Sequence, residues 1–144
     1  MSLNIIIPCY NESRRLPVNK YLDFLKLNKK VKIIFVNDGS TDNTKNLVNK
    51  LSNKFPKQIK ILSYEENKGK GNAVRDGFLY AVRQNMSGNM AYLDADLSTS
   101  LEECKLLSKK INDKIKFVFG SRMPKSNNVI KRKFHRFIIG RSIA

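Results

Sequence analysis

Short, mostly apolar runs alternate along the chain with longer segments whose apolar residues recur at helical spacing, and this alternation most constrains the fold. The runs are rich in branched side chains, as is typical of strands buried on both faces of a sheet. They occupy residues 3–7, 31–36, 59–62, 90–93 and 115–119. The segments between them predict helices around residues 15–27, 47–55, 73–82 and 101–111. We therefore predict one α/β domain with a mostly parallel sheet flanked by helices.

Polar or charged residues follow each predicted strand. They include Glu12, Asp38, Lys70, Asp94 and Arg122. Because the carboxyl ends of parallel strands meet at one edge of a sheet, where ligands bind, we expect these side chains to gather there. Any one of these clusters has a simpler explanation as a turn or a helix cap. For residues 40–42 that explanation is the more frequent one, with Asp42 or Ser40 capping the next helix.

Asp94 and Asp96 follow the run 90–93 with one residue between them. If the strand geometry continues, the two side chains point to the same side, roughly 6–7 Å apart. Two such carboxylates repel each other unless a positive charge lies between them. Mg²⁺ or Mn²⁺, bridged to the phosphates of a ligand, would provide that charge. The alternative is a strand that simply ends in a polar turn.

The net charge of +16 indicates an anionic partner, which could be a nucleic acid, a phospholipid surface or a phosphorylated small molecule. No acidic residue follows Asp113, and the segment 123–144 mixes basic and apolar residues. This tail is typical of a segment that lies on anionic lipid, or of a helix that packs against further chain. The basic residues are dispersed and no aromatic stacking motif accompanies them, so we do not expect nucleic-acid binding.

Two cysteines, Cys9 and Cys104, have no metal-binding or redox spacing, which predicts inert free thiols in a reducing cytosol. No run approaches 18 consecutive apolar residues, so we expect a cytoplasmic chain at the periphery of a membrane. His135, the single histidine, lies in the basic tail and receives no role.

Four motifs, in order and at matching spacing, resemble the successive signatures of family 2 glycosyltransferases. They are the segments 7–12, 36–44, 67–73 and 94–99. The resemblance covers about residues 3–122, and the run 94–100 with Gly120-Ser121-Arg122 is most similar to the polyprenyl- or dolichyl-phosphate sugar synthases. It implies a GT-A, Rossmann-like fold and inverting, metal-dependent transfer from a UDP- or GDP-linked sugar. The implied acceptor is a polyprenyl or dolichyl phosphate at the cytosolic face of a membrane.

The resemblance also implies a role for each matching residue. Pro8, Tyr10 and Glu12 would line the base and ribose pocket. Asp38 would accept a hydrogen bond from the base, while Lys70, Gly71 and Ala95 would approach the nucleotide-sugar. Asp94 and Asp96 would hold Mg²⁺ or Mn²⁺ and, with Arg122, form the catalytic group. Arg122, Arg132 and Arg136 would contact phosphate of the donor or the acceptor.

The chain is shorter than members of this family, which predicts a GT-A domain over residues 1–122 that is truncated at its C-terminus. Residues 123–144 would then begin an incomplete region near the acceptor and the membrane. A phosphate acceptor is already anionic, so the lack of a later carboxylate base does not prevent transfer. The alternative is a catalytically incomplete subunit that binds a nucleotide-sugar. A nucleotidyltransferase is disfavoured because no Gly-rich basic loop follows the first strand.

Overall fold

The computed structural model describes residues 2–120, and these form a three-layer α/β domain. Four parallel strands make the central sheet, in the order β3-β2-β1-β4. The strands are β1 (Leu3–Cys9), β2 (Val31–Asp38), β3 (Ile59–Tyr64) and β4 (Asn89–Tyr92). The helices are α1 (Val18–Leu27), α2 (Thr44–Lys54), α3 (Lys70–Arg83) and α4 (Leu101–Ser108). The predicted α/β fold with a parallel sheet is confirmed.

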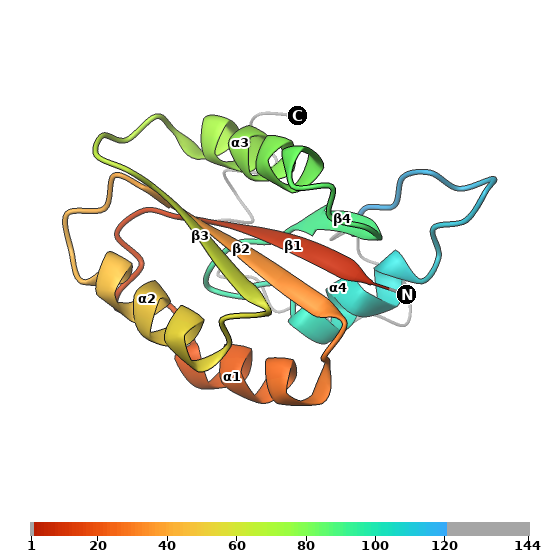
Figure 1. Cartoon of the computed structure of the whole chain (residues 1–144), viewed down its shortest axis with the longest axis horizontal. Helices are drawn as coiled ribbons and strands as arrows, with labels where there is room; N and C mark the ends of the chain where they lie inside the picture. The colour runs from red at the N-terminus through yellow and green to blue at the C-terminus, as the bar shows by residue number, and fades with distance from the viewer. Residues whose placement is uncertain (1, 121–144) are drawn as a thin grey trace, which may run out of the picture.

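The two faces of the sheet are covered by different helices, with α3 on one face and α1 and α2 on the other (Figure 1). Side chains along β1 alternate between these layers, as the strand geometry requires. Ile5 and Ile7 belong to the larger core with α1, α2 and α4, while Ile6 belongs to the smaller core under α3. Burial on both faces explains why the inner strands contain so few polar residues.

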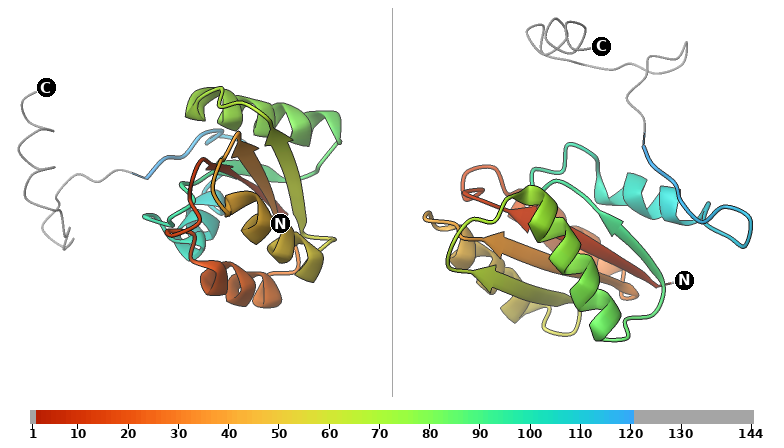
Figure 2. Two further views of the ribbon diagram at one scale, coloured as in Figure 1. Left: turned by 90° about the vertical axis from the view of Figure 1, so that its left-hand side faces the viewer. Right: turned by 90° about the horizontal axis from the view of Figure 1, so that it is seen from above.

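Gly77 lets α3 approach the sheet closely. A Cβ atom at this position would lie 2.5 Å from Cγ2 of Ile6 and 3.2 Å from Cγ2 of Val36. The helix therefore rests directly on β1 and β2, crossing above the strands as Figure 2 shows. This contact fixes the N-terminus of α3 relative to the carboxyl ends of those strands.

One predicted strand is wrong. Residues 115–120 have no regular secondary structure, although 115–119 are apolar at four of five positions. No backbone hydrogen bond joins them to β4 within residues 2–120, so they lack the ladder that defines a strand. Phe117 and Phe119 are 79% and 74% exposed, which shows that apolar composition without a paired neighbour does not make a strand.

Candidate functional site

A polar cleft lies at the carboxyl ends of the strands, where the loops after β1, β2 and β3 gather at one end of the sheet (Figure 1). Its volume is about 420 Å³, within the range typical of small-molecule sites. Its lining residues come from four separate parts of the sequence and are Pro8, Cys9, Tyr10, Glu12, Arg15, Asp38, Asn67, Gly69, Lys70, Asp94, Ala95, Asp96 and Ser98. We call this site the polar cleft.

Eight of the predicted site residues line the polar cleft: Pro8, Tyr10, Glu12, Asp38, Lys70, Asp94, Ala95 and Asp96. Gly71, the second residue of α3, is exposed to solvent and does not line it. Arg122, Arg132 and Arg136, like the whole basic tail, lie outside the described residues. Their predicted contacts with phosphate stay predictions.

Sequence reasoning missed five lining residues: Cys9, Arg15, Asn67, Gly69 and Ser98. Four of them lie within the motifs 7–12, 67–73 and 94–99, and their position in these motifs could have identified them. Arg15 lies beyond its motif and enters the cleft through an ion pair with Glu12, in which Nη2 is 2.6 Å from Oε1. The second carboxylate oxygen of Glu12, Oε2, is buried and has no hydrogen-bond partner within the described residues.

Asp38 organises the third loop of the cleft. Its carboxylate is buried at the end of β2, with the residue 2% exposed, and accepts the backbone N–H groups of Lys68 at 2.8 Å and Gly69 at 2.9 Å. Gly39 makes this approach possible, because a Cβ atom there would lie 2.4 Å from the backbone N of Asn67, and its φ of 65° suits glycine. Asp38 thereby holds the loop that leads into the N-terminus of α3.

Lys70, the first residue of α3, forms an ion pair with Oδ1 of Asp94. This hydrogen bond raises the pKa of the Lys70 ammonium above its usual value, although partial burial opposes the shift. The pair brings a cation, a carboxylate and a helix N-terminus to one wall of the polar cleft. Because carboxylates outnumber cations in the lining, an anionic ligand here would need a metal cation in addition to the helix N-terminus.

Asp94 and Asp96 both line the cleft, but not for the reason that the sequence suggested. β4 ends at Tyr92, so strand alternation does not extend to either aspartate. The turn that follows places them instead, with Oδ1 of Asp96 accepting the N–H of Ser98 at 3.0 Å and Leu97 at a φ of 53°. The buried hydroxyl of Tyr21 donates to the carbonyl of Ala95 at 2.9 Å and anchors the middle of the turn to α1.

The donor set of this turn fits a hard divalent cation. Carboxylate oxygens are the ligands that Mg²⁺ and Mn²⁺ prefer, and Mg²⁺ is commonly held by one or two carboxylates together with substrate phosphates. Residues 2–120 contain no group of three or more His, Cys, Asp or Glu side chains that could hold a metal. Asp94 and Asp96 would therefore need ligand oxygens to complete the coordination sphere.

Cys9 lines the cleft yet is ill suited to chemistry. Burial raises the pKa of its thiol far above the usual value, and the nearby Glu12 carboxylate raises it further. Burial likewise raises the pKa of Cys104 to about 11. Both thiols are free and buried, as the sequence predicted, and neither forms thiolate near neutral pH.

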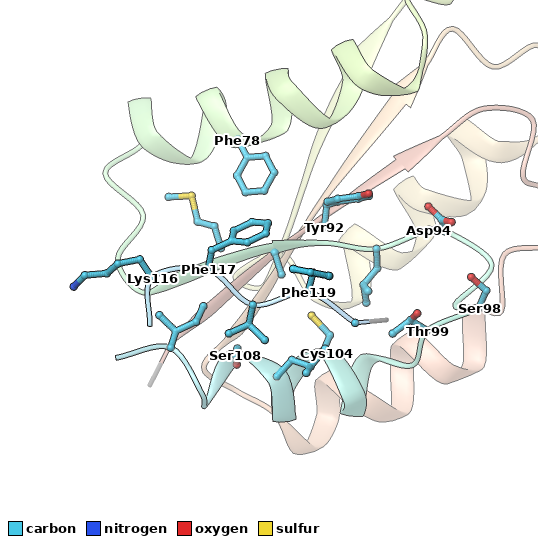
Figure 3. Close-up of a pocket in the computed structure, with 17 residues that line it drawn as sticks. Phe78, Tyr92, Asp94, Ser98, Thr99, Cys104, Ser108, Lys116, Phe117 and Phe119 are labelled. Carbon is cyan, nitrogen blue, oxygen red and sulfur yellow. The ribbon is translucent and has the colours of Figure 1, made fainter. Parts of the chain in front are cut away.

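A second, apolar pocket of about 320 Å³ lies beside β4, between α3, α4 and the irregular residues 116–120. Figure 3 shows Phe78, Phe117 and Phe119 in it, with Asp94, Ser98 and Thr99 at one end. Asp94 and Ser98 line both sites. We call this second site the apolar pocket.

Comparisons with known proteins point to one family. A model described as "Glycosyl transferase family 2" matches residues 4–143. Dolichyl-phosphate beta-glucosyltransferase ALG5A of Trichomonas vaginalis is 34% identical over 147 residues, which cover 92% of this chain and 44% of the relative. The Homo sapiens dolichyl-phosphate beta-glucosyltransferase is 30% identical over 120 residues, or 77% of this chain and 36% of the relative. The chain thus spans less than half the length of these relatives.

Two solved structures share the architecture. S. aureus TarS 1-349 in complex with UDP matches with a TM-score of 0.52 and 26% identity, over 67% of this chain and 28% of that one. Mannosyltransferase PcManGT from Pyrobaculum calidifontis, in complex with GDP-Man and Mn2+, matches with a TM-score of 0.52 and 24% identity, over 65% and 27%. The likeness to PcManGT concerns the fold alone.

Proposed function

This chain belongs to glycosyl transferase family 2 and has the GT-A fold, and from that premise we propose that its polar cleft binds a nucleotide-activated sugar through a divalent cation. The observation that supports this proposal best is the convergence of Lys70, Asp94 and Asp96 beside the N-terminus of α3. An ammonium group, two carboxylates that can bind a metal ion, and the positive end of a helix dipole together suit a diphosphate. The net charge of +16 further favours an anionic ligand.

The remaining cleft residues are suited to binding the base and ribose of the ligand. Tyr10 is 47% exposed at the mouth of the cleft, where its ring could stack on a base. Oε2 of Glu12 is a buried acceptor without a partner in the described residues, and a ribose hydroxyl could donate to it. The Asp38 carboxylate accepts two backbone N–H groups. Its remaining lone pairs could accept an N–H of the base.

We further propose that the reaction is inverting transfer of a sugar, glucose being the first to test, to dolichyl or polyprenyl phosphate. Similarity to two dolichyl-phosphate beta-glucosyltransferases supports this acceptor and sugar. An oxygen of the acceptor phosphate would attack the anomeric carbon as the bond to the nucleoside diphosphate breaks. A bound Mg²⁺ or Mn²⁺ would neutralise charge on that leaving group. The Lys70 ammonium, at the N-terminus of α3, would stabilise the same negative charge on the leaving group.

A lipid-linked acceptor would place the protein at a membrane surface, and we propose the cytosolic face. Within residues 2–120, no helix combines the length and apolarity needed to cross a bilayer. The basic tail would add electrostatic attraction to anionic lipid, of about 1 kcal/mol per basic residue near the surface.

The proposal is tested by a thermal-shift panel of UDP, GDP and their glucose conjugates, with and without Mn²⁺. A ligand that binds only the folded state raises the melting temperature by mass action. We expect a metal-dependent rise with one nucleotide series, followed by transfer of labelled glucose to dolichyl phosphate. Binding without transfer or donor hydrolysis would instead favour a catalytically incomplete nucleotide-sugar-binding subunit. No shift with any nucleotide would overturn the donor site itself.

A further inference from the structure

The loop after β1 carries Tyr10 and Glu12 into the polar cleft. Asn11, between them, has a φ of 52°, a left-handed conformation that asparagine adopts more readily than most residues other than glycine. Tyr10 is 47% exposed, so burial alone does not hold its ring in place. Contacts with a neighbouring loop therefore matter for the position of this ring.

The loop after β2 supplies that support through side-chain hydrogen bonds. The N–H of Glu12 donates to Oγ1 of Thr44 at 2.8 Å, and the N–H of Ser13 donates to Oδ2 of Asp42 at 3.0 Å. In the opposite direction, Oδ1 of Asn11 accepts the N–H groups of Thr41 at 2.9 Å and Asp42 at 3.3 Å. The two loops are about 30 residues apart in sequence, so only the fold brings these partners together.

Thr44 is the centre of this arrangement. It is fully buried, and its hydroxyl accepts from Glu12 while donating to Oδ1 of Asp42. One buried hydroxyl thus joins the backbone of the cleft loop to the carboxylate of the neighbouring loop. The expectation that Asp42 or Ser40 caps α2 is wrong, because the N-cap is Asn43 and it has no side-chain cap hydrogen bond. Within its own turn, Asp42 accepts the N–H of Thr44 at Oδ1, at 2.9 Å. The bonds to Glu12 and Ser13 reach a different loop.

None of Asn11, Asp42 and Thr44 lines the polar cleft. We propose that these three are positioning residues, which hold Tyr10 and Glu12 in the geometry that receives the nucleoside. This inference rests on the proposed function and deepens it. Because a loop that is ordered before binding loses less freedom on binding, the three residues should strengthen nucleotide affinity without touching the nucleotide.

The test compares Thr44→Val, which keeps the shape and removes the hydroxyl, with Thr44→Ser, which keeps the hydroxyl. Calorimetry with UDP and GDP in the presence of Mn²⁺ should show affinity about tenfold weaker in Thr44→Val and close to the parent in Thr44→Ser. Mn²⁺ affinity measured at saturating UDP, by electron paramagnetic resonance, should not change, because Asp94 and Asp96 lie on another loop. Amide exchange at Glu12 should accelerate in Thr44→Val alone.

Asp42→Asn provides a second variant in case Thr44→Val does not fold, with Asp23→Asn on the exposed face of α1 as its matched control. Equal nucleotide affinity in the parent, in Thr44→Val and in Asp42→Asn would overturn the positioning role. A parallel loss of Mn²⁺ affinity and melting temperature would also overturn it, since that would indicate a general structural role. A parent that binds neither UDP nor GDP would instead overturn the proposed function.

Discussion

The polar cleft and the apolar pocket share Asp94 and Ser98 but are built in opposite ways. In and behind the polar cleft, side chains of one loop accept the backbone N–H groups of another, as Asp38 does in the cleft and Asp42 does behind it. In the apolar pocket, Phe117 and Phe119 stand largely exposed beside an edge of β4 that has no backbone partner within residues 2–120. Directional bonds between loops therefore define the first site, whereas Phe117 and Phe119 bring non-directional apolar contact to the second.

The contrast indicates where a ligand can be held precisely. A loop fixed by several hydrogen bonds keeps its polar groups aimed at one place, which recognition of a nucleotide requires. An irregular apolar segment gives a ligand surface to bury but does not fix the ligand's orientation, because hydrophobic contact is non-directional. The predictions below challenge this distinction, from the largest expected effect to the smallest.

Asp96→Ala should have the largest effect. Loss of a direct metal ligand should weaken Mn²⁺-dependent nucleotide binding by at least about 100-fold, more than the loss of a typical outer-shell partner. The fold should survive, because the side chain is exposed. Calorimetry with Mn²⁺ and circular dichroism would check both points, with Asp113→Ala as the control. A response to Mn²⁺ equal to that of the parent would show that the metal assignment is wrong.

Tyr10→Ala and Tyr92→Ala compare the two sites directly, because the side chains are similarly exposed, at 47% and 53%, and each lines one site only. Loss of base stacking should cost Tyr10→Ala about 1–3 kcal/mol of nucleotide binding, or roughly 5- to 160-fold in affinity. Tyr92→Ala should bind as the parent does. Equal losses in titrations with UDP and GDP would contradict separate roles for the two sites.

Lys70→Met should weaken binding of a nucleoside diphosphate by about tenfold, because a charge-assisted contact to phosphate is lost. The melting temperature should change little, since the Lys70–Asp94 ion pair is about half-exposed and such pairs stabilise weakly. Lys68→Met is the matched control, because Lys68 lies two residues before Lys70 and its ammonium faces the ring of Tyr64 instead. If both variants bind alike, the specific role of Lys70 is refuted.

Acid should destabilise the hydrogen-bonded loops beside the polar cleft. Partial burial alone would raise the pKa of Asp42, but hydrogen bonds from Ser13 and Thr44 outweigh it and hold that pKa well below its usual range. The stability contributed by the ionised carboxylate is therefore complete at neutral pH and is lost as the pH falls below about 4. Unfolding monitored from pH 5 to pH 2 should show a smaller loss in Asp42→Asn than in Asp23→Asn. Parallel curves would contradict this assignment.

Phe117→Ser with Phe119→Ser should have the smallest effect on nucleotide affinity, within about twofold, because neither residue lines the polar cleft. Binding of a hydrophobic dye should fall, since exposed apolar area is removed. Dye fluorescence and UDP calorimetry on the same double variant would check both results. A large loss of nucleotide affinity would show that the two sites are coupled through Asp94 or Ser98.

Much of the fold and of the cleft membership could be predicted from sequence, because both depend on local patterns. Apolar runs and helical stripes predicted the strands and helices, with shifts at their ends such as α1 beginning at Val18 instead of near Arg15. Since parallel strands end at one edge, residues as distant as Glu12 and Asp94 could be placed together. The predicted strand at 115–119 failed because strand formation requires a paired neighbour, which composition does not reveal.

The sequence by itself determined which residue types lie at the cleft, since alternating strand and helix patterns predict a parallel sheet whose strands end at one edge. Only the tertiary structure decided what each of them contacts. It assigned Asp38 to the N–H groups of residues 68 and 69, paired Lys70 with Asp94, and joined Glu12 to Thr44. Hydrogen bonds depend on distance and angle within a few tenths of an ångström, and the spacing of residues along a chain does not contain that information.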